Sequence, residues 1–219
     1  MRTKVYEGIG NLNDLIRRSS TSGKVDVLRD SGGNVSKIIF VRNDMVSLYG
    51  KFPEVVGIDS TYKTDKMGWP LYQFVITDSF GRGRTVLFAL TQTGKRTDIK
   101  QILQSFKNIM GDTSKTTTFT IYCAPGQLRA LNKEFPSASI ILCLFHVCQG
   151  FRKKFSNPLV KKWLYRMAHT RSYATFWHCV RIIDLIDQAA GAYIHEQSKQ
   201  LMDHNESSTA CFMKLQTVL

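Results

Sequence analysis

The stretch FPEVVGIDSTYKTDKMGWPLYQFVITD, residues 52–78, decides the fold because it places one carboxylate, Asp59, inside an apolar segment. Val55, Val56 and Ile58 are β-branched, and so few polar positions predict a strand that is buried on both faces. The turn-rich residues that follow are typical of a loop. LYQFVITD then predicts a second strand, which ends in an acid of its own.

An ionised carboxylate in such a strand needs a partner, which is a backbone donor, a basic side chain or a divalent cation that takes oxygen ligands. Asp59 either ends its strand and caps the following turn, or it is a metal ligand. Perturbed carboxylates occur both at functional sites and in structural networks. The strand pattern alone therefore leaves both readings open.

Composition and charge limit the class of protein. A chain of 219 residues with 43% hydrophobic residues suits one α/β domain with an appendage. The formal net charge of +13 favours nucleic acid or an anionic membrane surface as partner. A run of 18 apolar residues and the apolar stretch of a signal peptide are both absent, so we expect no membrane partner. Five cysteines without a close CxxC pair argue against a disulfide framework and favour a reducing compartment.

The order of predicted elements indicates a mixed sheet. A glycine-rich turn, DSFGRGR, joins LYQFVITD to a third antiparallel strand, TVLFALTQ. Next come a helix from Thr97 that stops at Gly111, the strand TTFTIYC, a helix around QLRALNKEF, and a fifth strand, ASIILCLFHV. Such a sheet has right-handed crossovers, and we expect helices on both faces.

This order divides the chain into three parts. Residues 1–34 form a polar N-terminal segment, with a short helix predicted at NLNDLIRR, and residues 35–150 form the core. SKIIFVRN, at the start of the core, predicts a further strand packed on the domain. Residues 151–219 form a basic helical segment that stops without a turn signal, so we expect it to be truncated.

The predicted ligand site lies at the carboxyl ends of the parallel strands. We expect Asp59, Ser60 and His146 in one cleft there, since His146 is near the end of the fifth strand. Cys143, His146 and Cys148 also resemble zinc ligands. However, residues three apart in an extended strand point to opposite faces, and a fourth ligand is not apparent, so we favour buried free cysteines over zinc.

The basic helical segment has the charge pattern of a phosphate binder. No acid occurs from Phe135 to Ile183, so the cations there lack nearby acids in the sequence. Phosphate neutralisation by such cations gives salt-dependent binding, and we assign the interleaved aromatic residues to a helical core. The predicted nucleic-acid contacts are Arg152, Lys153, Lys154, Lys161, Lys162 and Arg166.

With these residues identified, the chain resembles the RNase H-like domain of Mutator-like (MULE) transposases, in the form domesticated in zinc finger SWIM domain-containing proteins. The resemblance rests on FPEVVGIDSTYKT, PLYQFVITDSFGRGR, and FPSASIILCLFHV with the basic RKKF after it. It implies an α/β fold with a mixed five-stranded sheet, flanking helices and a helical insertion or extension. It also implies a strand-transfer site in which three carboxylates, Asp59 being the first, hold two Mg²⁺ ions. Cys143 and His146 match the family's Cys-x-x-His feature.

The chain departs from this pattern at the second and third acids. Where relatives have Asp-Lys-Asp, this sequence has Tyr122, Cys123 and Ala124. The third acid is not fixed by the sequence, with Glu196 and Glu206 as candidates. Asp112 would substitute for the second acid only with an altered register, and Asp78 only if its turn folds back. We therefore predict a vestigial Asp59 that is held by the hydroxyls of Ser60 or Thr61, with weak metal affinity at best.

Three classes of function remain in competition: an active metal-dependent transposase, a catalytically degenerate domain that binds DNA or scaffolds a nuclear complex, and a protein-interaction module. We favour the degenerate domain, with no cofactor, whereas the active transposase would require Mg²⁺. The expected partner is DNA bound without sequence preference, and the expected location is the nucleus. The Cys-x-Cys and Cys-x-His pairs of a SWIM finger do not occur in this chain.

Overall fold

The computed structural model describes residues 23–61, 68–122, 125–170 and 172–202. The helix predicted at NLNDLIRR lies outside these residues. The strands are β1 (Gly23–Arg29), β2 (Val35–Arg42), β3 (Val55–Thr61), β4 (Leu71–Thr77), β5 (Gly83–Thr91), β6 (Thr118–Ile121) and β7 (Ser139–Leu142). The helices are α2 (Asn43–Lys51), α3 (Arg96–Met110), α4 (Pro125–Glu134), α5 (Leu144–Lys154), α6 (Pro158–Ala168), α7 (Tyr173–Ile186) and α8 (Gln188–Met202).

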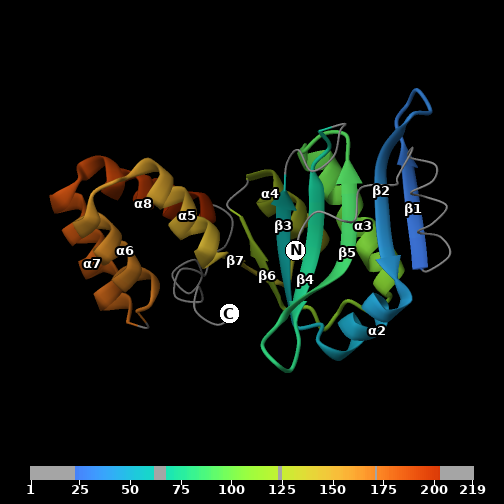
Figure 1. The fold of residues 1–219 in the computed structure, drawn as a ribbon, viewed down its shortest axis with the longest axis horizontal. Helices are drawn as coiled ribbons and strands as arrows, with labels where there is room; N and C mark the ends of the chain where they lie inside the picture. Colours follow the sequence, from blue (N-terminus) through green and yellow to red (C-terminus); the bar gives the residue numbers. More distant parts are fainter. Residues whose placement is uncertain (1–22, 62–67, 123–124, 171, 203–219) are drawn as a thin grey trace, which may run out of the picture.

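All seven strands belong to one mixed sheet with the order β1-β2-β5-β4-β3-β6-β7 (Figure 1). β3, β4 and β5 form the predicted antiparallel meander, and β3, β6 and β7 run parallel. The α/β class is confirmed, but the sheet has seven strands rather than five because β1 and β2 extend it beyond β5. β1 lies within the predicted N-terminal segment, and the Ser105 hydroxyl donates to Asp26 at 2.5 Å, which ties β1 to α3.

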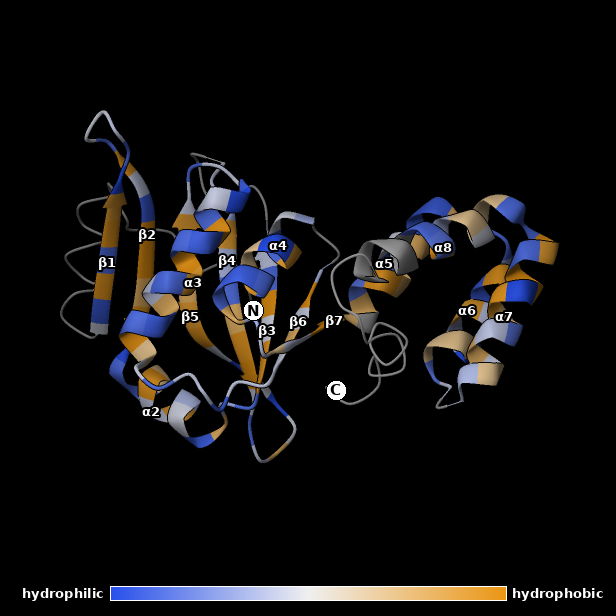
Figure 2. Cartoon of the chain, turned by 180° about the vertical axis from the view of Figure 1, so that it is seen from behind, coloured by the Kyte–Doolittle hydropathy of each residue, from blue (hydrophilic) through white to orange (hydrophobic). Residues whose placement is uncertain are grey.

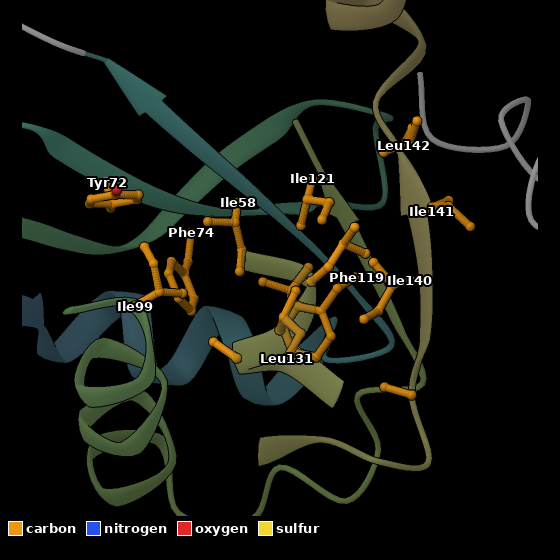
Figure 3. Close-up of a cluster of buried hydrophobic side chains, with 14 of the residues drawn as sticks. Ile58, Tyr72, Phe74, Ile99, Phe119, Ile121, Leu131, Ile140, Ile141 and Leu142 are labelled. Atoms are coloured by element: carbon orange, nitrogen blue, oxygen red, sulfur yellow. The ribbon is translucent and has the colours of Figure 1, made fainter. Parts of the chain in front are cut away.

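One face of the sheet carries most of the core. Alternate side chains of β3 and β4, including Val56, Ile58 and Phe74, are buried. Figure 3 shows Ile58 and Phe74 within this cluster, and Figure 2 shows the helices α2, α3 and α4 on that side of the sheet. The intervening positions, such as Val55 and Val75, are only half-buried. The prediction of helices on both faces was wrong for the part of the chain that the structure describes, since these three helices all cover the same face.

Two glycines have positions that require them. Gly111 adopts a φ of +78° and ends α3, which confirms the predicted stop signal. At Gly57, a Cβ atom would lie 2.9 Å from the Thr120 hydroxyl oxygen, so the absence of a side chain lets β6 lie close to β3. Helix α2 was not predicted, because it is short and buries only Met45 and Tyr49.

The predicted fifth strand is shorter than expected. β7 ends at Leu142, and Cys143 is the N-cap of α5, which begins one residue later. ASIILCLFHV has the apolar run of a buried strand throughout, and such a run does not distinguish a strand from a buried helix. His146 therefore lies in the first turn of a helix, and this change alters the geometry of the site.

Helices α5 to α8 continue beyond the β7 edge of the sheet (Figure 1). Asn157 caps α6 by accepting a hydrogen bond from the backbone N–H of Leu159, with Pro158 in the first turn. Buried apolar side chains join α6, α7 and α8 into one core, which is continuous with that of the sheet. None of the helices in the described ranges is long and apolar enough to cross a membrane.

A buried ion pair connects β2 to the start of α3. Lys37 Nζ lies 2.8 Å from Asp98 Oδ1, and both side chains are 8% exposed. Asp98 Oδ2 also accepts hydrogen bonds from the Thr93 hydroxyl at 2.5 Å and from the backbone N–H of Lys95 at 3.3 Å. A buried charge without its partner is costly, so this pair constrains how α3 docks on the sheet.

Lys37→Met tests this constraint. Because the substitution leaves the Asp98 carboxylate buried without a counter-ion, the free energy of unfolding should fall by about 3 kcal/mol. Urea denaturation followed by circular dichroism measures the change. Arg42→Met is the matched control, because it removes the exposed ion pair between Arg42 and Asp44 and should leave stability unchanged. Equal stability of Lys37→Met and the unaltered chain would show that the pair does not contribute.

Candidate functional site

Asp59 lies near the carboxyl end of the central strand β3. The register pairs it with Gln73 of β4, and the alternation of β3 places it on the same face as Gly57, opposite to the buried Ile58. Its side chain is 44% exposed. Ser60, the next residue, therefore points to the other face of the sheet, and the prediction that it shares a cleft with Asp59 was wrong.

His146 reaches Asp59 from the first turn of α5. Its Nε2 lies 3.3 Å from Asp59 Oδ1, so the structure brings together these two residues from opposite sides of β6. Its Nδ1 is buried and has no hydrogen-bond partner among the described residues. The Asp59 carboxylate therefore places a hydrogen-bond acceptor beside Nε2, whereas Nδ1 has none among these residues.

Two aromatic rings flank His146. The rings of Tyr122 and Phe145 each lie edge-on to the imidazole, with centroids 5.4 Å away. Tyr122 directly follows Ile121, which pairs with Ile58, so the register places Tyr122 opposite Asp59. Cys143 occupies the next position in this row, since its backbone N–H donates to the Ile121 carbonyl.

This set of side chains does not fit a pair of Mg²⁺ ions. Such ions need carboxylates from more than one strand, whereas the described neighbours of Asp59 are an imidazole, a phenol ring, a thiol and the Gln73 amide. Among the described residues, no group of three or more His, Cys, Asp or Glu side chains is arranged to hold a metal. Neither Ser60 nor Thr61 donates a hydroxyl to Asp59 within these residues, so the contact with His146 takes the place of the predicted one.

The other candidate acids lie elsewhere. Asp78 is in the β4–β5 turn, at the opposite end of the sheet from Asp59. Asp112 precedes β6 and accepts a hydrogen bond from the backbone N–H of Ser114. Glu196 is exposed on α8 and belongs to no metal-binding group with Asp59 in the described ranges, so its prediction as third acid is not supported. Glu206 lies outside the described residues.

Cys143 and His146 lie at the start of a helix, and not on the extended strand whose geometry argued against zinc. Cys143 and His146 lie in the first turn of α5, where residues three apart share a face, so the reasoning from an extended strand does not apply. Among the residues that the structure describes, no third ligand joins Cys143 and His146. Burial raises the pKa of the Cys148 thiol above its usual value, so the neutral thiol predominates at pH 7.

A second feature is the basic surface, which we define as Arg152, Lys153 and Lys154 of α5 with Lys161, Lys162 and Arg166 of α6. All of these side chains are exposed except Lys161, which is half-buried. None forms an ion pair with an acid among the residues described. The α5 cations lie in the last turn of their helix, where the helix dipole favours positive charge.

The aromatic residues of this region divide into two groups. Phe151 and Phe176 are buried, as predicted for a helical core. Tyr165 is 59% exposed, however, and its ring stacks on that of His169 at a centroid distance of 4.0 Å. Tyr165 shares a face of α6 with Lys162, three residues earlier, so the assignment of every aromatic residue to the core was wrong. The spacing of aromatic residues along one helix does not show which face of that helix the neighbouring helices leave exposed to solvent.

One comparison with known proteins decides the family. The sequence model of the RNase H-like domain of zinc finger SWIM domain-containing proteins 1 and 3 matches residues 15–141. The chain belongs to this family. The matched region covers more than half of the chain and runs from before β1 into β7, so the sheet and Asp59 fall within the family domain. His146 and the whole basic surface follow the matched region, so their roles rest on geometry.

Tyr122→Asp tests whether the missing second acid explains the poor fit to Mg²⁺. The substitution places a carboxylate opposite Asp59, so 10 mM Mg²⁺ should raise the melting temperature of the variant by about 3 to 6 °C if the new site binds with roughly millimolar affinity. The unaltered chain should show no such rise. Tyr122→Asn and the double variant Tyr122→Asp with Asp59→Asn serve as controls. An equal rise in the unaltered chain would contradict our reading of the site.

Proposed function

We propose that this RNase H-like domain is a domesticated relic of a Mutator-like transposase that binds DNA without cutting it. The observation that carries the proposal is a basic surface on α5 and α6 that forms no ion pair among the described residues, together with Asp59, whose described neighbours supply no second carboxylate. A nuclear location is part of this proposal.

The charge distribution supports a contact with the phosphate backbone. The net charge of +13 is concentrated in part on two consecutive helices without a single acid. Each phosphate that such cations neutralise releases counter-ions and adds a salt-dependent contribution to affinity. Contacts to phosphates carry no base information, so the proposed binding is not sequence-specific. The exposed ring of Tyr165 beside Lys162 adds a surface on which a base can stack.

The geometry around Asp59 supports the loss of cleavage. Phosphoryl transfer in a two-metal site depends on ions that hold both the attacking and the leaving oxygen. One carboxylate leaves most of the coordination positions to water, and Mg²⁺ disfavours the soft thiol of Cys143. The contact of Asp59 with His146 gives the acid a structural role, since it links the central strand to α5.

Charge reversal of Arg152, Lys153 and Lys154 to Glu tests the DNA-binding proposal. Fluorescence anisotropy with a labelled duplex should show salt-sensitive binding by the unaltered chain. Because three phosphate contacts are lost, the variant should bind all sequences more weakly, and the slope of log K against log salt should be shallower by about 2 to 3.

The matched control reverses Arg96, Arg129 and Lys133 on α3 and α4. These side chains are also exposed, and the change in net charge is the same, but they lie outside the basic surface. We expect this control to retain most of the affinity. Salt-independent binding, no binding at micromolar protein, or equal losses in the two triple variants would contradict the proposal, and the first two would favour a protein-interaction module.

Loss of cleavage is tested with a labelled duplex that resembles a transposon terminal repeat, in the presence of Mg²⁺ or Mn²⁺. The unaltered chain and Asp59→Asn should give the same background, because neither has a second acid at the site. Cleavage that disappears in Asp59→Asn would instead identify an active transposase. Far-ultraviolet circular dichroism would establish that both proteins are folded.

A further inference from the structure

The β4–β5 hairpin continues beyond the strands on either side of it. β4 pairs with β5 as far as Thr77 and Gly83, whereas the ladder between β3 and β4 ends at Val75. On the other side, β2 pairs only with residues 88–91 of β5. The end of the hairpin is therefore a two-stranded ribbon without a lateral neighbour in these ladders, and Figures 1 and 2 show it projecting from the sheet.

The turn of this ribbon is held in one conformation. Asp78 Oδ1 accepts hydrogen bonds from the backbone N–H groups of Phe80 and Arg82, at 2.9 and 3.0 Å. The backbone N–H of Gly81 also donates to the Asp78 carbonyl, and Gly81 adopts a φ of +73°, which favours glycine. The Asp78 side chain is only 9% exposed. Its carboxylate is thus engaged by the turn and by an ion pair with Arg84.

The side chains at the tip combine one apolar ring with two cations. Phe80 is 82% exposed, and the guanidinium carbon of Arg82 lies 5.8 Å from the centre of its ring. Arg84 is 55% exposed and lies 3.7 Å from Asp78. An ordered turn that presents an aromatic ring beside two cations has the side chains of a contact surface for an anionic partner.

We propose that this ribbon enters a groove of duplex DNA. The major groove admits a two-stranded β-ribbon, Arg82 and Arg84 are then positioned for phosphates or base edges, and Phe80 makes apolar contact with the bases. A protein partner fits less well, because a stable protein interface needs at least about 1,000 Å² and the tip offers one aromatic ring between two charges. Charge complementarity with this basic chain favours DNA.

This inference goes beyond the proposed function because it concerns a different surface. β4 runs antiparallel to β3, so the hairpin lies at the amino end of β3, whereas Asp59 and the start of α5 lie at its carboxyl end. The hairpin would give the domain a DNA contact that is independent of the basic surface. Loss of one contact should therefore weaken binding without abolishing it.

Phe80→Ala and the double variant Arg82→Ala with Arg84→Ala test the inference, with fluorescence anisotropy on a labelled duplex. Phe80→Ala should weaken binding roughly fivefold with an unchanged salt slope, because it removes only apolar contact. The arginine variant should make the salt slope shallower by about 2. Phe80→Trp should retain affinity, since a larger aromatic ring preserves the contact.

Two matched controls separate the hairpin from general effects. Leu185→Ala removes an apolar side chain that is 83% exposed on α7, and Arg96→Ala with Arg129→Ala removes two exposed cations from α3 and α4. Both should bind like the unaltered chain, and thermal melting should show that all variants are folded. Full affinity of the hairpin variants would overturn the inference, as would equal losses in the controls.

The outcome also distinguishes this inference from the proposed function. If reversal of the α5 cations weakens binding while the hairpin variants bind fully, the inference fails and the proposed function stands. If only the hairpin variants lose affinity, the inference stands and the assignment of the basic surface fails. If the unaltered chain binds no duplex at low salt, both are overturned.

Discussion

The position of β3 between β4 and β6 is the constraint on which the rest of the structure depends. β3 pairs antiparallel on one side and parallel on the other, so it is the strand at which the meander changes into crossover connections. Val56 and Ile58 are buried on one face, and the same alternation directs Asp59 to the other face. A shift of one residue in the register of β3 would move every side chain to the other face of the sheet. Burial of the apolar side chains therefore also determines the face on which Asp59 lies.

The parallel strands then determine which residues surround that acid. Ile121 pairs with Ile58 and Leu142 pairs with Ile121, so the residues that follow these three, Asp59, Tyr122 and Cys143, form a row at the carboxyl ends of their strands. Topology of this kind brings ligands together in many α/β sheets. Here the row supplies one carboxylate, and α5 adds the imidazole of His146. The scaffold of the family is retained, and the chemistry at its edge differs from a two-metal site.

Much of this arrangement was predictable from the sequence, for reasons that are local. Alternation in the meander and helical spacing before Gly111 follow from short patterns. The proximity of Asp59 to His146 followed from the predicted strand order, although His146 lies on α5 and not on the strand. The start of α5 was not predictable, because the apolar run LCLFHV is compatible with a buried strand and with a buried helix. The exposure of Tyr165, and of the sheet face that carries Asp59, depends on how helices distant in sequence are placed, which no local pattern contains.

The central claim is that Asp59 is engaged by His146 and does not serve as a metal ligand. Nitrogen-15 NMR of the His146 ring at neutral pH, with and without millimolar Mg²⁺, tests it most directly, with Asp59→Asn used to assign the effect of the carboxylate. The claim predicts a proton on Nε2, a shift of that nitrogen in Asp59→Asn, and no change on addition of Mg²⁺. An Nε2 without a proton, or a saturable Mg²⁺-dependent change that Asp59→Asn abolishes, would contradict it.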